Sequence, residues 1–247
     1  MRDSNQFCLR IGGTRSRKRT QGGQEIIEFG LSLFLLVPLL LGMFVVGMGM
    51  IRSIQVHHVV RDVDNIYIHG GDFSSYNYQQ LAQRLATGLN LQFPAFGGGV
   101  TNANANTGSS GDGIIWVTQL LRVGSTTDPQ CQGVGAANCT NHDKYVFLQR
   151  IKFGNSTLTT KRDSFVADPA SAIVGTTGSV SNPVTDSRAQ LNAAGQTAVT
   201  ALFADTTSGQ TPLTDGQVLY VVEGFFQTPS FSLNPYTVSG IYARYIF

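Results

Sequence analysis

The stretch 22-GGQEIIEF-29 and the apolar run that follows it decide the fold of this chain. From Phe29 to Ile51 there are 23 residues without a charged side chain, most of them Leu, Val, Met, Phe or Gly. A helix rises about 1.5 Å per residue, so this run is long enough to cross the roughly 30 Å hydrocarbon core of a bilayer. Lipid offers the backbone no hydrogen-bonding partner. We therefore predict a membrane-spanning helix over 29–51.

Charged residues mark the start of this run. Glu25 and Glu28 stand where the positive end of the helix dipole favours negative charge. The part up to Gly23 carries six Arg or Lys residues and one Asp, and the rest has 11 basic and 14 acidic residues, a net charge of −3. Basic residues that flank a first span stay in the cytoplasm, so we expect a cytoplasmic N-terminus and an extracytoplasmic C-terminal part. No basic patch with interleaved aromatics occurs elsewhere, and we expect no nucleic-acid partner.

The basic leader, the glycine, the glutamate and the apolar helix together resemble the processing site of type IV prepilins. The closest resemblance is to the TadE-like minor pilins (pseudopilins) of the Tad, or Flp, pilus system. It implies that Gly23 precedes the cleavage site, that Gln24 becomes the new N-terminus, and that Glu28 is the fifth mature residue. Phe29 matches the aromatic that usually follows the glutamate, whereas Gln24 departs from the Phe or Met often found first. A cut after Gly22 would leave an isoleucine in the fifth position.

The resemblance also implies a function and partners. TadE-like proteins act in assembling or priming a pilus for surface attachment and cell adhesion, after processing by a prepilin peptidase. The expected partners are that peptidase, other Tad pilins and minor pilins through the N-terminal helix, and the bacterial inner membrane. Glu28, with Glu25 as its neighbour, is the implied assembly residue, because this glutamate pairs with the N-terminal amine of a neighbouring subunit. Whether the protein enters the fibre, sits at its tip or aids assembly in the membrane stays open.

A second reading is an uncleaved single-span envelope protein whose exported domain binds a ligand or a surface. Such an anchor would also show basic residues, a span and helix-capping glutamates. It has no reason, however, to place Glu25 and Glu28 at the head of the apolar run, where charge is costly. A secretory signal peptide fits less well, because its apolar core is usually about 7–15 residues and ends in a small-residue cleavage site.

The helical pattern continues beyond the span. Apolar residues recur at helical spacing from Ile54 to Tyr67, and 69-HGG-71 supplies a glycine stop signal. We therefore predict one helix over 24–69, roughly 69 Å long at 1.5 Å per residue. Pro38 removes one backbone hydrogen bond in the middle of the span and predicts a kink.

The C-terminal part has a different pattern. A shorter helix is expected over 75–90, with an apolar stripe of Leu81, Leu85 and Leu89, followed by a linker at about 97–112 rich in Gly, Asn and Ser. The polar stretch 154–216 contains two short elements, around Phe165 and over 198–203. Residues rich in β-formers predict four strands, at 114–121, 144–153, 218–226 and 238–247. The domain organisation is thus a leader (1–23), a long helix (24–69) and an extracytoplasmic domain (70–247), and the fold class is α+β, with the long helix packed on an antiparallel sheet of about four strands.

Two cysteines close a short loop between the first two predicted strands. Cys131 and Cys139 enclose a run of small residues, and an exported compartment permits disulfides. A metal site needs more ligands, and only His142 is near. The expectation is a Cys131–Cys139 disulfide, with two free thiols as the alternative. Cys8 lies in the leader, on the reducing side.

No motif in the sequence points to catalysis or to a cofactor. There is no G-x-S-x-G, H-E-x-x-H, P-loop or dinucleotide-binding pattern. His57 and His58 are adjacent on the helix and cannot chelate together, and Asp62 and Asp64 point to different sides. The sequence therefore names no catalytic, cofactor-binding or metal-binding residue, and we expect a structural and interaction protein and not an enzyme.

Overall fold

The computed structural model describes residues 22–94, 105–204, 213–228 and 240–247. The chain forms two compact units, an N-terminal one that ends at Val46 and a C-terminal one that comprises 47–247. The predicted leader lies outside the described residues, apart from its last two positions.

Helix α1 (Gly22–Ile68) is 47 residues long and belongs to both units. It is unbroken at Pro38, where the kink remains a prediction. The helix ends where the sequence predicts. Gly70 adopts a left-handed φ of 87°, and the amide of Gly71 donates to the carbonyl of Ile66 at 2.9 Å. Glycine reaches that φ without a steric penalty, which explains the stop signal.

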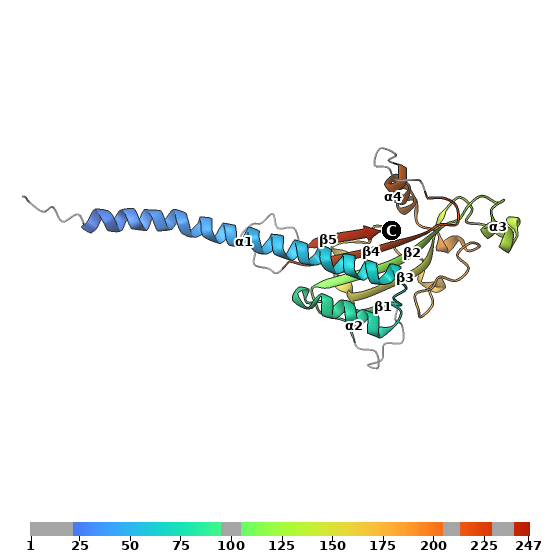
Figure 1. The fold of residues 1–247 in the computed structure, drawn as a ribbon, viewed down its shortest axis with the longest axis horizontal. Helices are drawn as coiled ribbons and strands as arrows, with labels where there is room; N and C mark the ends of the chain where they lie inside the picture. The colour runs from blue at the N-terminus through green and yellow to red at the C-terminus, as the bar shows by residue number, and fades with distance from the viewer. Residues whose placement is uncertain (1–21, 95–104, 205–212, 229–239) are drawn as a thin grey trace, which may run out of the picture. The chain divides into compact units, whose positions relative to one another are not determined.

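The second unit is built on one mixed sheet of five strands in the order β1-β3-β2-β4-β5 (Figure 1). All neighbours are antiparallel except β1 and β3, which run parallel. The α+β class is confirmed, but the expected four-stranded antiparallel sheet is wrong in strand number and in this one pairing. The strands are β1 (Ala105–Gly108), β2 (Gly113–Arg122), β3 (Tyr145–Asn155), β4 (Val218–Phe226) and β5 (Ile241–Ile246).

Strand β1 lies inside the stretch predicted to be a linker. It has only four residues, Ala-Asn-Thr-Gly, with weak intrinsic strand preference. Two contacts hold it. The backbone pairs with the end of β3, and the buried side chain of Asn106 donates to Gln79 at 2.7 Å. Tertiary pairing therefore creates a strand that local composition does not predict.

The second half of α1 packs on one face of the sheet. Val56, Val60 and Val63 are fully buried there with Val117 of β2 and Val222 of β4. The approach is close at Gly224 of β4, where an added Cβ would lie 2.4 Å from Cγ2 of Val60. The helix therefore fits the sheet because glycine occupies that position.

Helix α2 (Tyr76–Leu85) and the 3-10 turn η1 (Thr87–Leu89) cover the same face (Figure 1). The predicted apolar stripe is wrong for two of its three leucines. Leu81 and Leu85 are 40% and 41% exposed, and only Leu89 is buried. The face of α2 that meets the core carries Gln79 and Ala82 instead, because Gln79 is held by hydrogen bonds to the Phe73 carbonyl and to Asn106.

Strands β2 and β3 form an antiparallel hairpin, with a long loop that contains α3 (Pro129–Val134) and η2 (Ala136–Asn138). The expected element around 198–203 is α4 (Ala193–Ala204), whereas Phe165 lies in a turn. The remaining 3-10 turns of the polar stretch are η3 (Ser156–Thr160), η4 (Ser171–Ile173) and η5 (Ser187–Ala189). A second core under these segments contains Leu120, Val146 and Leu219.

Candidate functional site

The predicted cleavage site lies in the first turn of α1. Gly23 is exposed, and a Cβ added there would meet nothing within 4 Å. Gln24 and Glu25 follow it in the same helix. A larger residue at Gly23 would therefore disturb no contact of the described chain.

Glu28 is an exposed carboxylate at the head of an exposed apolar surface. Its neighbours Ile27 and Phe29 are 69% and 68% exposed, and one turn further on Leu31 is 69% exposed. Glu25 precedes Glu28 by three residues in the same helix. Water would not favour so much exposed apolar surface around one charge, whereas lipid or another protein surface would cover it.

The apolar part of α1 has the length and composition of a membrane span. Its most apolar window of 18 residues has a mean hydropathy of 2.6, and none of that window is buried in the protein. Phe34, for example, is 83% exposed. The helix is thus consistent with a single-pass membrane protein.

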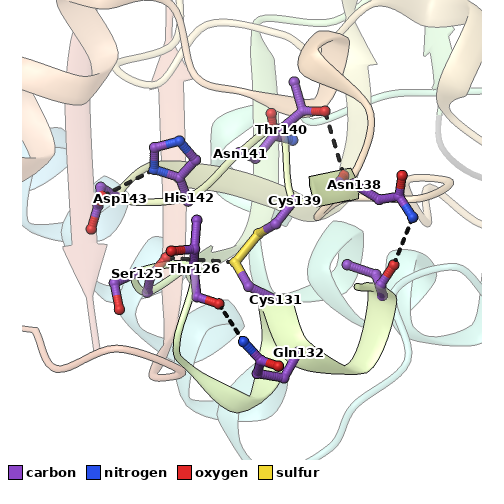
Figure 2. Close-up of a disulfide and its surroundings, with 12 residues drawn as sticks. Ser125, Thr126, Cys131, Gln132, Asn138, Cys139, Thr140, Asn141, His142 and Asp143 are labelled. Carbon is purple, nitrogen blue, oxygen red and sulfur yellow. Dashed lines mark hydrogen bonds and ion pairs between the residues drawn. A yellow bond between two sulfur atoms is a disulfide. The ribbon is translucent and has the colours of Figure 1, made fainter. Parts of the chain in front are cut away.

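Cys131 and Cys139 form a disulfide, as predicted (Figure 2). Both cysteines are buried and their Cα atoms are 5.1 Å apart. Two side-chain hydrogen bonds hold the loop. Gln132 Nε2 donates to the Thr126 carbonyl at 2.7 Å (Figure 2), and Asn138 Nδ2 donates to the Val134 carbonyl at 3.1 Å. The free-thiol alternative is therefore wrong.

The residues that the structure describes in this loop do not form a cluster of metal ligands. Nδ1 of the exposed His142 ring lies 3.1 Å from a carboxylate oxygen of Asp143, its neighbour in sequence (Figure 2). Among the residues that the structure describes, no three His, Cys, Asp or Glu side chains come together as metal ligands would.

The other face of the sheet holds a buried polar cluster that sequence reasoning missed. Glu223 of β4 is fully buried, and its carboxylate accepts hydrogen bonds from three groups. These are the hydroxyl of Ser164, the amide of Phe165 at 2.6 Å and the hydroxyl of Tyr242 at 2.5 Å. Burial, together with the charge and the hydrogen bond of Glu223, raises the pKa of Tyr242 above its ordinary value.

Arg150 of β3 completes this cluster. Its guanidinium donates to Asp168 at 2.8 Å and to the hydroxyl of Thr118 at 2.5 Å, and lies 3.7 Å from Glu223. Burial acts to raise the pKa of Asp168, but the charges of Arg150 and Lys152 outweigh it and hold this pKa below its ordinary value. The cluster ties segment 164–168 to the sheet. Its sequence signal was a charged residue inside an apolar strand, as in 218-VLYVVEGFF-226.

Asp64 is a second buried acid without an assigned role. It lies on α1 with an exposure of 0%, and neither carboxylate oxygen has a hydrogen-bond partner. Burial raises its pKa to about 6. The sequence showed that Asp62 and Asp64 face different sides, but not that the second of them is turned into the protein.

Comparison with known proteins adds no relative to this picture. No family model, no curated protein and no solved structure matches the chain.

Proposed function

We propose that this protein is a TadE-like minor pilin, anchored by α1 and cleaved after Gly23, that acts in assembling or priming a Tad pilus for surface attachment. One observation carries the proposal. Glu28 stands five residues after Gly23 as an exposed charge at the head of an exposed, uncharged apolar helix. An anchor alone needs no charge at that position, because a carboxylate close to the hydrocarbon core is costly.

In the proposed mechanism, α1 exchanges contacts with lipid for contacts with other helices. The membrane stores the subunit, and during assembly the apolar side chains of α1 leave lipid and contact the helices of neighbouring subunits. Glu28 then pairs with the ammonium group of a neighbour's Gln24. Breaking a buried ion pair by removing one partner costs about 3–5 kcal/mol, enough to favour the register in which each Glu28 meets an amine.

The orientation has two supports. The leader carries six of the 17 Lys and Arg residues, as expected for a cytoplasmic flank. The domain after α1 contains a disulfide, which persists in oxidising compartments. We infer a cytoplasmic N-terminus and an extracytoplasmic second unit, in the bacterial inner membrane or, after assembly, in the pilus.

The uncleaved envelope protein remains the second candidate, and one observation favours it. The second unit has an open depression, and its lining residues are Arg122, Asp143, Lys144, Gln196, Thr197, Thr200 and Ala201. Arg122 is paired with Asp215 at 3.4 Å, and Asp143 stands beside Lys144, so the depression suits a polar group of a ligand or a surface that carries little net charge.

Substitution at the cleavage site separates the two candidates. Gly23→Leu should keep the leader on the protein in cells that contain the peptidase, because the enzyme must accommodate the backbone just before the cut. Gly30→Leu is the matched control, since an added Cβ at Gly30 also meets nothing within 4 Å. Migration on a gel shows whether the leader is still attached to the protein. If Gly23→Leu runs like the mature wild type, the assigned site is wrong.

A further inference from the structure

The C-terminal strand β5 is one open edge of the sheet. Tyr220 and Phe247 exchange both backbone hydrogen bonds, at 2.7 and 2.9 Å. Bonding directions alternate along an antiparallel pair, so Tyr242, Arg244 and Ile246 direct their N–H and C=O groups away from β4. Within the described part of the chain, no backbone hydrogen bond uses these outward groups.

Strand β1 lies at the opposite edge of the sheet, and the bonding directions of β3 show which of its backbone groups face β3. The amide of Arg150 donates to the carbonyl of Gly178 at 2.8 Å, on the side away from β2. Because the directions alternate, Lys152 and Gly154 also point away from β2 and toward β1.

Strand β1 therefore has an outward row of its own. Ala105 and Thr107 lie opposite Lys152 and Gly154 in a parallel register. In a parallel pair, a residue bonds to the two neighbours of the residue opposite it, so Asn106 bonds to β3. The N–H and C=O groups of Ala105 and Thr107 point outward, and no bond among the described residues uses them.

The two open edges match in direction. Strand β1 is parallel to β3, and β3, β2, β4 and β5 are successively antiparallel, so β5 runs antiparallel to β1. If two copies stand side by side in the same orientation, β5 of one copy meets β1 of the next as an antiparallel pair.

The edges also match in the faces of their side chains. Asn106 points to the face covered by α2, because it bonds Gln79, so Thr107 points to the other face. Tyr242 bonds Glu223 on that other face, and the guanidinium carbon of Arg244 lies 3.7 Å from the centre of the Phe165 ring there. Residues opposite each other in a sheet share a face, so the outward residues of the two edges can pair directly.

We propose that copies of this chain associate edge to edge, with β5 of one copy pairing antiparallel to β1 of the next. The occupant of each open edge is thus a second copy of this chain. Such an interface uses two different surfaces and repeats from copy to copy, as in a ring or a filament. Backbone hydrogen bonds would provide the association, as in other cases of strand addition.

The entry point of α1 distinguishes this arrangement from a two-fold dimer. Within the second unit, Arg52 of α1 donates to the carbonyl of Gln227 at 2.8 Å, so the first turns of α1 in this unit lie at the end of the sheet where β4 stops and β5 starts, which we call the entry end. A two-fold β5–β5 pair would place the entry ends of the two copies on opposite sides. A pair centred on Arg244 would also set two like charges opposite each other, which is unfavourable. Edge-to-edge association keeps every entry end on one side, as a shared membrane requires, and this step rests on the proposed function.

Cysteine cross-linking in membranes tests the proposal on the full chain. In a Cys8→Ala background, a chain with Thr107→Cys is coexpressed with a larger tagged chain that carries Arg244→Cys. We expect a disulfide-linked mixed dimer at least tenfold more abundant than either dimer of like variants. Ile246→Cys replaces Arg244→Cys in a second set, because it leaves the contact with Phe165 intact. The exposed Thr200→Cys on α4 is the control and should give no mixed dimer.

The outcomes separate this inference from the proposed function. Dimers that form mainly between two Arg244→Cys or two Ile246→Cys chains would overturn the arrangement in favour of a two-fold pair. Absence of cross-links in both sets would also overturn it, even if the same chains have lost their leader and behave as pilins. Mixed dimers in chains that keep the leader would support the edge contact and count against the pilin assignment.

Discussion

At the scale of single residues, Glu28 carries most of the proposed function. Glu28→Ala removes a charge at the head of the span, so membrane insertion should be no harder, and the leader should still be removed because cleavage depends on Gly23. The neighbour's ammonium then enters the apolar bundle unpaired. We expect a mature, membrane-resident protein that does not support pilus assembly, with Glu25→Ala/Glu28→Ala at least as severe.

Piliation scored by microscopy, beside a blot for processing in the same cells, measures this effect. The control is Asp62→Ala, which removes an acidic residue of α1 beyond the predicted span. Normal pili in the double variant at wild-type protein levels would indicate that both glutamates act only as helix caps and not in assembly.

Asp64 gives a pH-dependent prediction. Burial raises its pKa in the folded protein from 3.8 to about 6. A raised carboxyl pKa favours the folded state below the unfolded value, and this contribution is lost as pH rises from about 4 through about 6. At 1.36 kcal/mol per pKa unit, the loss is about 3 kcal/mol. We expect the difference in unfolding free energy between Asp64→Asn and the wild type to shift in favour of the variant over this range.

Thermal unfolding of the full chain in detergent, at several pH values, provides the measurement. Asp62→Asn is the matched control, because it removes the charge of a neighbouring, half-buried acid of α1. Parallel pH profiles for Asp64→Asn and the wild type would show that this carboxyl has the same pKa in the folded and the unfolded protein, and would contradict the effect of burial.

At the scale of elements, the sequence predicts the helices and strands that depend only on residues close together in the chain. The end of α1 follows from a glycine that adopts a positive φ, and β2 to β5 follow from runs of β-branched and aromatic residues. Strand β1 and the buried face of α2 do not follow from such patterns. Both depend on the pair Asn106 and Gln79, a hydrogen bond between residues 27 positions apart that composition cannot indicate.

Helix α2 can be tested directly by one substitution on each side. Leu81→Glu places a charge on a partly exposed position and should change the unfolding free energy by no more than about 0.5 kcal/mol. Ala82→Glu forces a larger, charged side chain into a site with 0% exposure and should destabilise the protein by several kcal/mol. Chemical denaturation distinguishes them, and equal effects would contradict the observed rotation of the helix.

The loop between β2 and β3 has its own test. Cys131 and Cys139 should resist alkylation in the denatured, non-reduced protein and react fully after a reductant is added. Cys8 serves as the internal control in chains that retain the leader, because it should label in both conditions. Ready labelling of both loop cysteines without reductant would contradict the disulfide and the export of this domain.

At the scale of the whole molecule, the apolar length of α1 and the late strands predict the α+β class. The buried cluster of Glu223 and Arg150 could not be predicted, because it depends on which strands become neighbours. The candidate processing site, in contrast, could be predicted from the sequence alone. Gly23 and Glu28 are read from their spacing in sequence, and the structure adds that both are exposed. Since no family model, curated protein or solved structure matches the chain, the proposed function rests on these residues.

The mature N-terminus tests the pilin assignment most directly. The full chain is expressed in cells that contain the Tad prepilin peptidase, extracted from membranes, and measured by intact-mass and N-terminal peptide mass spectrometry, with Gly23→Leu as the uncleavable reference. We expect a wild-type protein that begins at Gln24, and a variant that keeps residues 1–23. A wild-type protein with an intact leader in those cells would contradict processing at Gly23 and favour the uncleaved envelope protein.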